Sequence, residues 1–236
     1  PHDISGRVIG EYLSDNENAK PLIELMKKSY DLLKNHPVNL ERIKKGERPA
    51  NSIWLWSPGK KPQLPNFKEK WGLNAAVISA VDLIKGIGLC ADMEVINVDG
   101  ATGNYSTNYT GKAEAAIDAF RRGNDLVYVH VEAPDECGHR GEWDVKVKAI
   151  EKIDELILAP VFKYLEESGE DFKVLVLPDH PTPVEIRTHS HEAVPFFMYD
   201  SRKEAAGPEL FSEDNCAKMN HHIADGSTLF GIMIEK

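Results

Sequence analysis

The chain has 236 residues, of which 42% are hydrophobic and 28% are charged, and this length can bury a full core. The formal net charge of -10 argues against a nucleic-acid partner or an anionic membrane surface, but it does not exclude a small anionic substrate. Three widely spaced cysteines argue against a disulfide framework, and no apolar segment reaches the roughly 20 residues of a membrane span, so we expect a cytoplasmic protein.

Residues 1–50 differ from the rest of the chain in being more polar. Residues 21–35 form the one helix predicted there, because their apolar side chains share one helical face: Leu22, Leu25, Met26, Leu32 and Leu33. We expect this helix to end before Pro37. Glycine and proline interrupt a polar segment at 44–51, which predicts a domain boundary and leaves residues 51–236 as the main domain.

The main domain alternates between short apolar runs and amphipathic stretches. We predict strands at residues 52–57, 94–98, 125–131, 172–177 and 194–199. We predict helices at residues 73–84, 112–122 and 142–167, and a glycine-containing turn at 100–107. Gly86 and Gly88 are expected to lie beyond the end of the first of these helices, as a glycine cap would. The alternation predicts an α/β fold with a mainly parallel sheet flanked by helices.

Aspartate and histidine residues follow two of the predicted strands. Asp135 and His139 come after the strand at 125–131, Asp179 and His180 come after the next strand, and His189 lies in the polar loop that follows. Ligands of open α/β sheets bind beyond the carboxyl ends of the strands, so these side chains are expected to meet. Carboxylates and imidazoles suit zinc or manganese, and five ligands exceed the three or four that one zinc takes. The sequence therefore predicts two metal ions, an arrangement that favours phosphoryl chemistry.

Several neighbouring residues have a structural as well as a functional interpretation. Gly138 is expected to let the chain bend sharply between Asp135 and His139, whereas Cys137 is expected to point away from the metals. Lys60 is a candidate for contact with a phosphate, although exposed lysines are common. The remaining histidine pair, at 221–222, is predicted to be a surface feature.

Three segments carry a more specific signature: VHVEAPDECGH, LPDHPTP and RTHSHEAVPF. Together with the GATG turn and the opening PHDISG, they resemble the archaeal-type, cofactor-independent phosphoglycerate mutases of the alkaline phosphatase superfamily, over essentially the whole chain. The resemblance implies an alkaline phosphatase-like sheet, a small phosphorylated substrate, two divalent ions (manganese, zinc or magnesium) and no need for 2,3-bisphosphoglycerate. It assigns Asp135, His139 and His189 to one metal, and Asp179 and His180 to the other.

In that family a serine attacks the phosphate of phosphoglycerate, and the resulting phosphoserine returns the phosphoryl group to the other hydroxyl. Family members normally begin with a strand that ends in an aspartate ligand, followed by this serine, and neither segment precedes Pro1. We therefore expect the C-terminal portion of a longer protein, with residues 1–50 as the tail of an inserted domain and no activity on its own. Three alternatives stay open: a homoserine kinase-like phosphotransferase, a phosphatase of the same superfamily, or a noncatalytic module. No oligomeric state is predicted.

Overall fold

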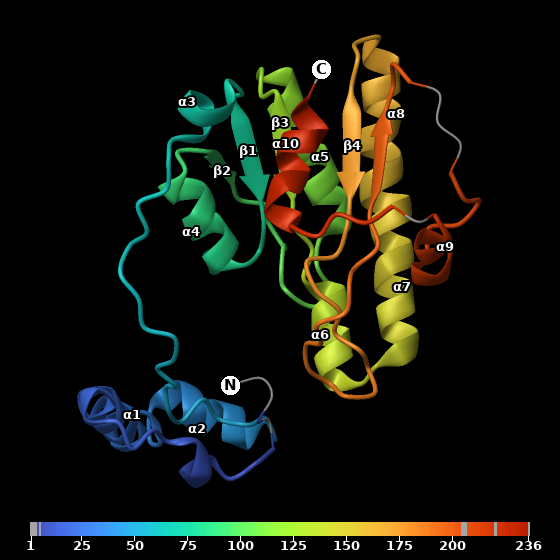
Figure 1. Cartoon of the computed structure of the whole chain (residues 1–236). Helices are drawn as coiled ribbons and strands as arrows, with labels where there is room; N and C mark the ends of the chain where they lie inside the picture. Colours follow the sequence, from blue (N-terminus) through green and yellow to red (C-terminus); the bar gives the residue numbers. More distant parts are fainter. Residues whose placement is uncertain (1–3, 5, 204–206, 220, 236) are drawn as a thin grey trace. The chain divides into compact units, whose positions relative to one another are not determined.

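The structure, a computed structural model, describes residues 4, 6–203, 207–219 and 221–235 (Figure 1). The chain divides into two compact units, Pro1–Pro62 and Gln63–Lys236. Residues 51–66, which include the division at 62/63, contain neither helix nor strand. The domain boundary expected near residue 50 stays a prediction.

The first unit consists of short helices: η2 (Ile9–Tyr12), η3 (Glu17–Ala19), α1 (Lys20–Leu33) and α2 (Pro37–Lys44). The predicted helix at 21–35 is confirmed as α1, with proline in its first turn. Helix α1 ends before Pro37, as predicted. Pro37 then begins α2, where proline is tolerated because the first N–H groups of a helix have no intrahelical partner. The preceding His36 accepts a hydrogen bond from the Val38 amide at 3.4 Å and so caps the helix.

The strand predicted at residues 52–57 is wrong. These residues form no strand, and Ile53 and Trp56 are 42% and 56% exposed. A short apolar run becomes a strand only when a neighbouring strand satisfies its backbone groups, and no strand of the described residues pairs with this run.

The second unit contains two sheets. Three parallel strands, β1 (Ala75–Ile78), β2 (Glu94–Ile96) and β3 (Leu126–Val129), lie in the order β2-β1-β3. The other two, β4 (Lys173–Val176) and β5 (Phe197–Asp200), form an antiparallel pair. The predicted α/β class with a mainly parallel sheet is confirmed, and four of the predicted strands are present.

The helix predicted at residues 73–84 is wrong, because its first half is the central strand β1. All four β1 residues are buried and pair with β3, and three of them, Ala76, Val77 and Ile78, also pair with β2 on the other side. A strand covered on both faces is continuously apolar and cannot be told from a buried helix by periodicity alone. The helix here is α4 (Asp82–Cys90), and it includes Gly86 and Gly88, which were expected beyond a helix end.

The other helices of this unit are α3 (Phe67–Trp71), α5 (Tyr109–Arg121), α6 (Ala133–Arg140), α7 (Trp143–Ile153), α8 (Ala159–Ser168), α9 (Glu213–Lys218) and α10 (Leu229–Ile234), with a 3₁₀ turn η5 (Gly226–Thr228). The helix predicted at 142–167 is formed by α7 and α8, which a π-helical segment, η4 (Asp154–Leu158), joins into one run. Pro160, in the first turn of α8, has no N–H for the regular helical bond, which accounts for the irregularity. None of the helices described is long and apolar enough to cross a membrane.

The core packs β3 and α6 against the helices beside them. Four buried residues form its centre: Tyr109, Ala133, Ala149 and Ile157. Figure 1 shows α6 and the loop after β4 at the end of the sheets toward which the arrowheads of β1 and β4 point. The fold therefore brings the two predicted Asp/His segments to the same end of the unit.

Candidate metal centre

Helix α6 carries the first two candidate ligands. Asp135 and His139 are four residues apart, so they lie on one face of the helix, with His139 Nε2 3.4 Å from Asp135 Oδ2. The expectation of a sharply bent loop here is wrong, because the segment after β3 turns directly into a helix. Pro134 in the first turn favours this start.

Gly138 has a different role from the one predicted. It lies inside α6, where a Cβ atom would come within 2.3 Å of the Thr182 carbonyl oxygen. A side chain at this position would push α6 away from the loop that follows β4. Glycine thus brings the two ligand-bearing segments into contact.

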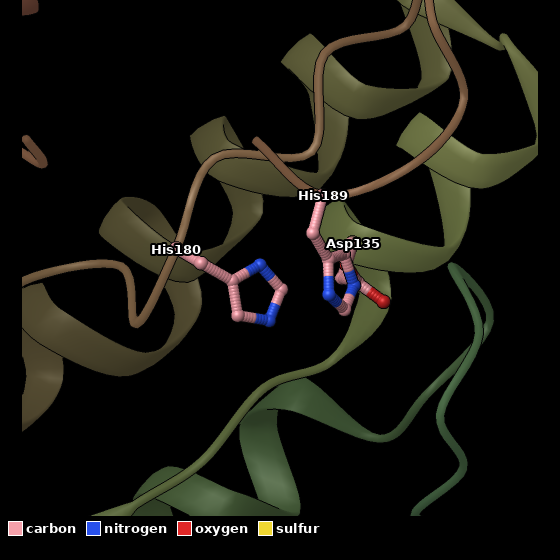
Figure 2. A group of neighbouring side chains, drawn as sticks. All are labelled: Asp135, His180 and His189. Atoms are coloured by element: carbon pink, nitrogen blue, oxygen red, sulfur yellow. The ribbon is translucent and has the colours of Figure 1, made fainter. Parts of the chain in front are cut away.

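The loop after β4 supplies the remaining candidates. His189 Nε2 lies 3.3 Å from Asp135 Oδ1 and 3.2 Å from His139 Nε2. His180 stacks beside His189, with ring centroids 3.7 Å apart. Asp135, His180 and His189 each offer a ligand atom, and these atoms all lie within 4.8 Å of one another. Figure 2 shows the side chains of Asp135 and His189 side by side, with the His180 ring facing them from the neighbouring part of the loop.

Asp179 is the outermost of the five candidates. Its side chain is largely exposed, and its Oδ2 lies 3.4 Å from His180 Nε2. The structure therefore brings four of the candidates together, and Asp179 contacts this group through His180. The His189 ring lies between the other two imidazoles, with its centroid 3.7 Å from that of His180 and 5.0 Å from that of His139, so the five residues form one continuous cluster.

These spacings fit a metal ion. Two ligands on a tetrahedral zinc with bonds of 2.0–2.1 Å are separated by about 3.3 Å. The contacts among Asp135, His139 and His189 are 3.2 to 3.4 Å. Imidazoles and carboxylates are both common ligands of divalent metal ions, so the chemistry of the cluster also suits such an ion.

A set of supporting groups surrounds the ligands. The Thr182 hydroxyl donates to Asp135 Oδ1 at 2.5 Å, and the Lys146 ammonium donates to the Thr182 carbonyl at 2.6 Å. Burial lowers the pKa of Lys146, while the nearby Asp135 carboxylate opposes this shift. His139 Nδ1 lies 3.0 Å from the carbonyl oxygen of Arg187, whose φ of 56° is in the left-handed region. A non-glycine residue held there is strained, and such strain often accompanies functional sites.

A second buried group lies behind the ligands. Lys112 is fully buried, and its ammonium donates to the His130 carbonyl at 2.8 Å. Burial lowers the pKa of Lys112 to about 8, with Glu132 opposing the shift. The His130 ring contacts the Ser79 hydroxyl at 3.1 Å, and burial lowers the pKa of this imidazole, which favours its neutral form.

These supporting residues were not predicted from the sequence. Thr182 lies in the segment LPDHPTP, two residues after His180, so its short distance from the candidate ligands in the sequence could have identified it. Lys112, Lys146 and Ser79 lie on other elements, and no spacing rule connects them to the ligands.

The remaining candidates lie apart from the cluster or in its packing. Cys137 is fully buried on α6, and burial raises the pKa of its thiol, in keeping with a packing role. Lys60 is exposed in the first unit, so its contact with a phosphate stays a prediction. His221 and His222 are exposed, as expected.

A parallel α/β sheet with a carboxylate–imidazole cluster beyond its strands is the architecture of a metal-dependent enzyme domain. The chain belongs to the metalloenzyme superfamily, whose family profile matches residues 14–228. Its relatives include the 2,3-bisphosphoglycerate-independent phosphoglycerate mutases of Methanosarcina barkeri, at 49% identity over 100% of this chain, and of Methanothrix thermoacetophila, at 47% over 99%. The chain spans 59% of the length of both relatives.

Solved structures support the same grouping. The PH0037 protein of Pyrococcus horikoshii is similar with a TM-score of 0.68 and 31% identity, covering 86% of this chain and 52% of that one. The cofactor-independent phosphoglycerate mutase of Thermoplasma acidophilum is similar with a TM-score of 0.55 and 26% identity, covering 92% and 51%. These likenesses confirm the predicted family resemblance.

Proposed function

We propose that these residues form the metal-binding part of a cofactor-independent phosphoglycerate mutase, which interconverts 3- and 2-phosphoglycerate. The main support is the cluster of Asp135, His139 and His189, with contacts of 3.2 to 3.4 Å, in a chain whose relatives are named as such mutases. The substrate is a small phosphorylated molecule, and the reaction runs through a phosphoserine enzyme.

The centre would hold two divalent ions. Asp135, His139 and His189 would bind one ion, and Asp179 and His180 would bind the other. Bound metal ions would stabilise the charge that develops on the transferring phosphoryl group. The chain's own contribution is to hold the ligands in place, through α6 on one side and the loop after β4 on the other.

We place the nucleophilic serine outside these 236 residues. Two serines lie beside the centre: Ser79 contacts His130, and Ser190 follows His189 in the chain. Ser79 is 2% exposed and accepts a hydrogen bond from the Val81 amide, and the Ser190 hydroxyl is buried. Neither hydroxyl is open to a substrate, so we expect this chain to lack mutase activity on its own. The assignment of residues 1–50 to an inserted domain belongs to the same proposal.

Metal binding is tested on the chain itself. Isothermal titration with Zn²⁺ and Mn²⁺ should show stoichiometric binding to the metal-free protein. Asp135→Ala and His189→Ala should each weaken it by more than the roughly 10- to 100-fold typical for loss of a group that only supports a ligand. His222→Ala, an exposed histidine outside the cluster, should bind like wild type. Equal affinity in all four proteins would exclude the centre.

The reaction is tested on a protein of the relatives' full length that carries these residues. Interconversion of 3- and 2-phosphoglycerate without ATP and without 2,3-bisphosphoglycerate is the expected result. ATP-dependent phosphorylation of homoserine, or release of inorganic phosphate alone, would assign a different reaction to the same centre.

A further inference from the structure

Thr182 lies between two of the candidate ligands. The residue is 3% exposed, and its hydroxyl oxygen lies 2.5 Å from Asp135 Oδ1 and 3.3 Å from His180 Nδ1. One buried hydroxyl therefore contacts a carboxylate of α6 and an imidazole of the loop after β4. These two ligands come from segments 45 residues apart in the chain (135 to 180).

Counting protons fixes the direction of both hydrogen bonds. A hydroxyl has one proton to donate, and a carboxylate can only accept, so the Thr182 proton goes to Asp135. The Thr182 oxygen must then accept from His180, which requires a proton on His180 Nδ1. In the neutral imidazole this leaves the lone pair on Nε2.

We propose that Thr182 is a positioning residue that holds His180 in the Nδ1–H tautomer and thereby presents His180 Nε2 to a metal ion. The inference rests on the proposed metal centre for its function, but the tautomer is a property of the metal-free chain. Metal-bound histidines commonly donate their other ring N–H to a fixed acceptor, which sets both the tautomer and the ring orientation.

The backbone of Thr182 is held in place by contacts with two helices, so the position of its hydroxyl is also restricted. Its carbonyl accepts from Lys146 on α7 at 2.6 Å and contacts Gly138 on α6, where no Cβ would fit. The Ser190 amide donates to the Pro181 carbonyl at 3.2 Å, which ties the far side of the loop to the same point. Through this hydroxyl, the packing of α6 and α7 on the loop determines where the His180 ring lies.

The two ring nitrogens of His180 face different partners, and in the metal-free chain the Asp179 carboxylate opposes Thr182 by favouring a proton on Nε2. With Nδ1 directed at Thr182, Nε2 is the ring nitrogen that lies 3.4 Å from Asp179 Oδ2. This spacing is close to the roughly 3.3 Å expected for two ligands of one tetrahedral ion. Thr182 therefore supports the Asp179–His180 half of the centre while it also holds Asp135 in the other half.

The direct test is the tautomer of His180 in the metal-free chain. Long-range ¹H–¹⁵N NMR correlations distinguish the two tautomers, at a pH of about 8, above the ordinary imidazole pKa of about 6.5. Wild type and Thr182→Ser should show a protonated Nδ1, whereas Thr182→Val should shift the ring toward the Nε2–H tautomer. A wild-type His180 with its proton on Nε2 would overturn the inference, whether or not the chain binds metal.

Metal affinity supplies the second readout. Thr182→Val keeps the shape of the side chain and loses the hydroxyl, so we expect about 10- to 100-fold weaker Zn²⁺ binding, while Thr182→Ser keeps the wild-type value. The matched control is Thr110→Val, an exposed threonine on α5, which should also keep it. Circular dichroism establishes that each variant is folded. Wild-type Zn²⁺ affinity in a folded Thr182→Val would overturn the inference, whereas absence of binding in wild type would overturn the metal centre alone.

Discussion

Lys112 is an ammonium group buried behind the ligands. It donates a hydrogen bond to the His130 carbonyl, and Glu132 supplies the opposing charge. Both contacts lie at the segment that connects β3 to α6. We infer that Lys112 fixes this connection, and thus the start of the helix that carries Asp135.

The lowered pKa of Lys112 has a consequence for stability. Burial lowers the pKa from 10.5 to about 8, so between these values the unfolded chain binds a proton that the folded chain does not. The unfolding free energy should therefore rise with pH in this window, by up to about 3 kcal/mol from this residue. Urea unfolding of wild type and Lys112→Met at pH about 7.5 and about 10 isolates the effect. The same pH dependence in both proteins would contradict it.

The proximity of the candidate ligands was predictable from the sequence to a large extent. They follow β3 or β4, and the structure brings four of the five together: Asp135, His139, Asp179, His180 and His189 are the five candidates, with Asp179 the outermost. The supporting groups were not predictable, because Thr182 and Lys146 come into contact only through the packing of α6 and α7 on the loop. The metals themselves and their division between the five residues stay a prediction.

Helix α4 packs closely on the central strand through one glycine. A Cβ on Gly88 would lie 2.4 Å from Val77 Cγ1, whereas a Cβ on Gly86 would meet nothing within 4 Å. Both residues lie inside the same helix, so they form a matched pair.

These two glycines should respond oppositely to alanine. Gly88→Ala overpacks the contact with β1 and should lower the unfolding free energy by about 1–3 kcal/mol. Gly86→Ala gains helix propensity in open space and should raise it by about 0.5–1 kcal/mol. Urea denaturation measures both, and a stabilised Gly88→Ala would show that α4 can move away from the strand.

Elements were predicted best where their periodicity was unambiguous. The amphipathic pattern of α1, α5 and the α7–α8 run identified these helices, and four strands followed from short apolar runs. The central strand β1 was mistaken for a helix because burial on both faces removes any alternation. Helix α6 was not predicted because its polar candidate ligands interrupt the apolar periodicity of a helix. The four-residue spacing of Asp135 and His139 nevertheless fits a helix.

At the scale of the whole molecule, residues 51–66 form a largely exposed segment around the division between the two units. Residues 51–66 have no helix or strand, and Lys60 and Lys61 are exposed within it. Because Pro62 blocks cleavage after Lys61, limited trypsin digestion should cut first after Lys60. Mass spectrometry should then find residues 1–60 and 61–236. Lys60→Gln should slow this first cut markedly, and an unchanged rate would place the accessible bond elsewhere.

Because the second unit has two separate sheets, it has more strand edges at which another copy of the chain could pair. Strands β3 and β4 each lie at an edge: β3 pairs only with β1, and β4 only with β5, among the described residues. Tyr128 on β3 is 47% exposed. An open edge presents backbone donors and acceptors that can pair with a strand from another molecule. The net charge of -10 opposes such pairing between copies. Salt screens this repulsion, so we expect edge-to-edge association to increase with ionic strength.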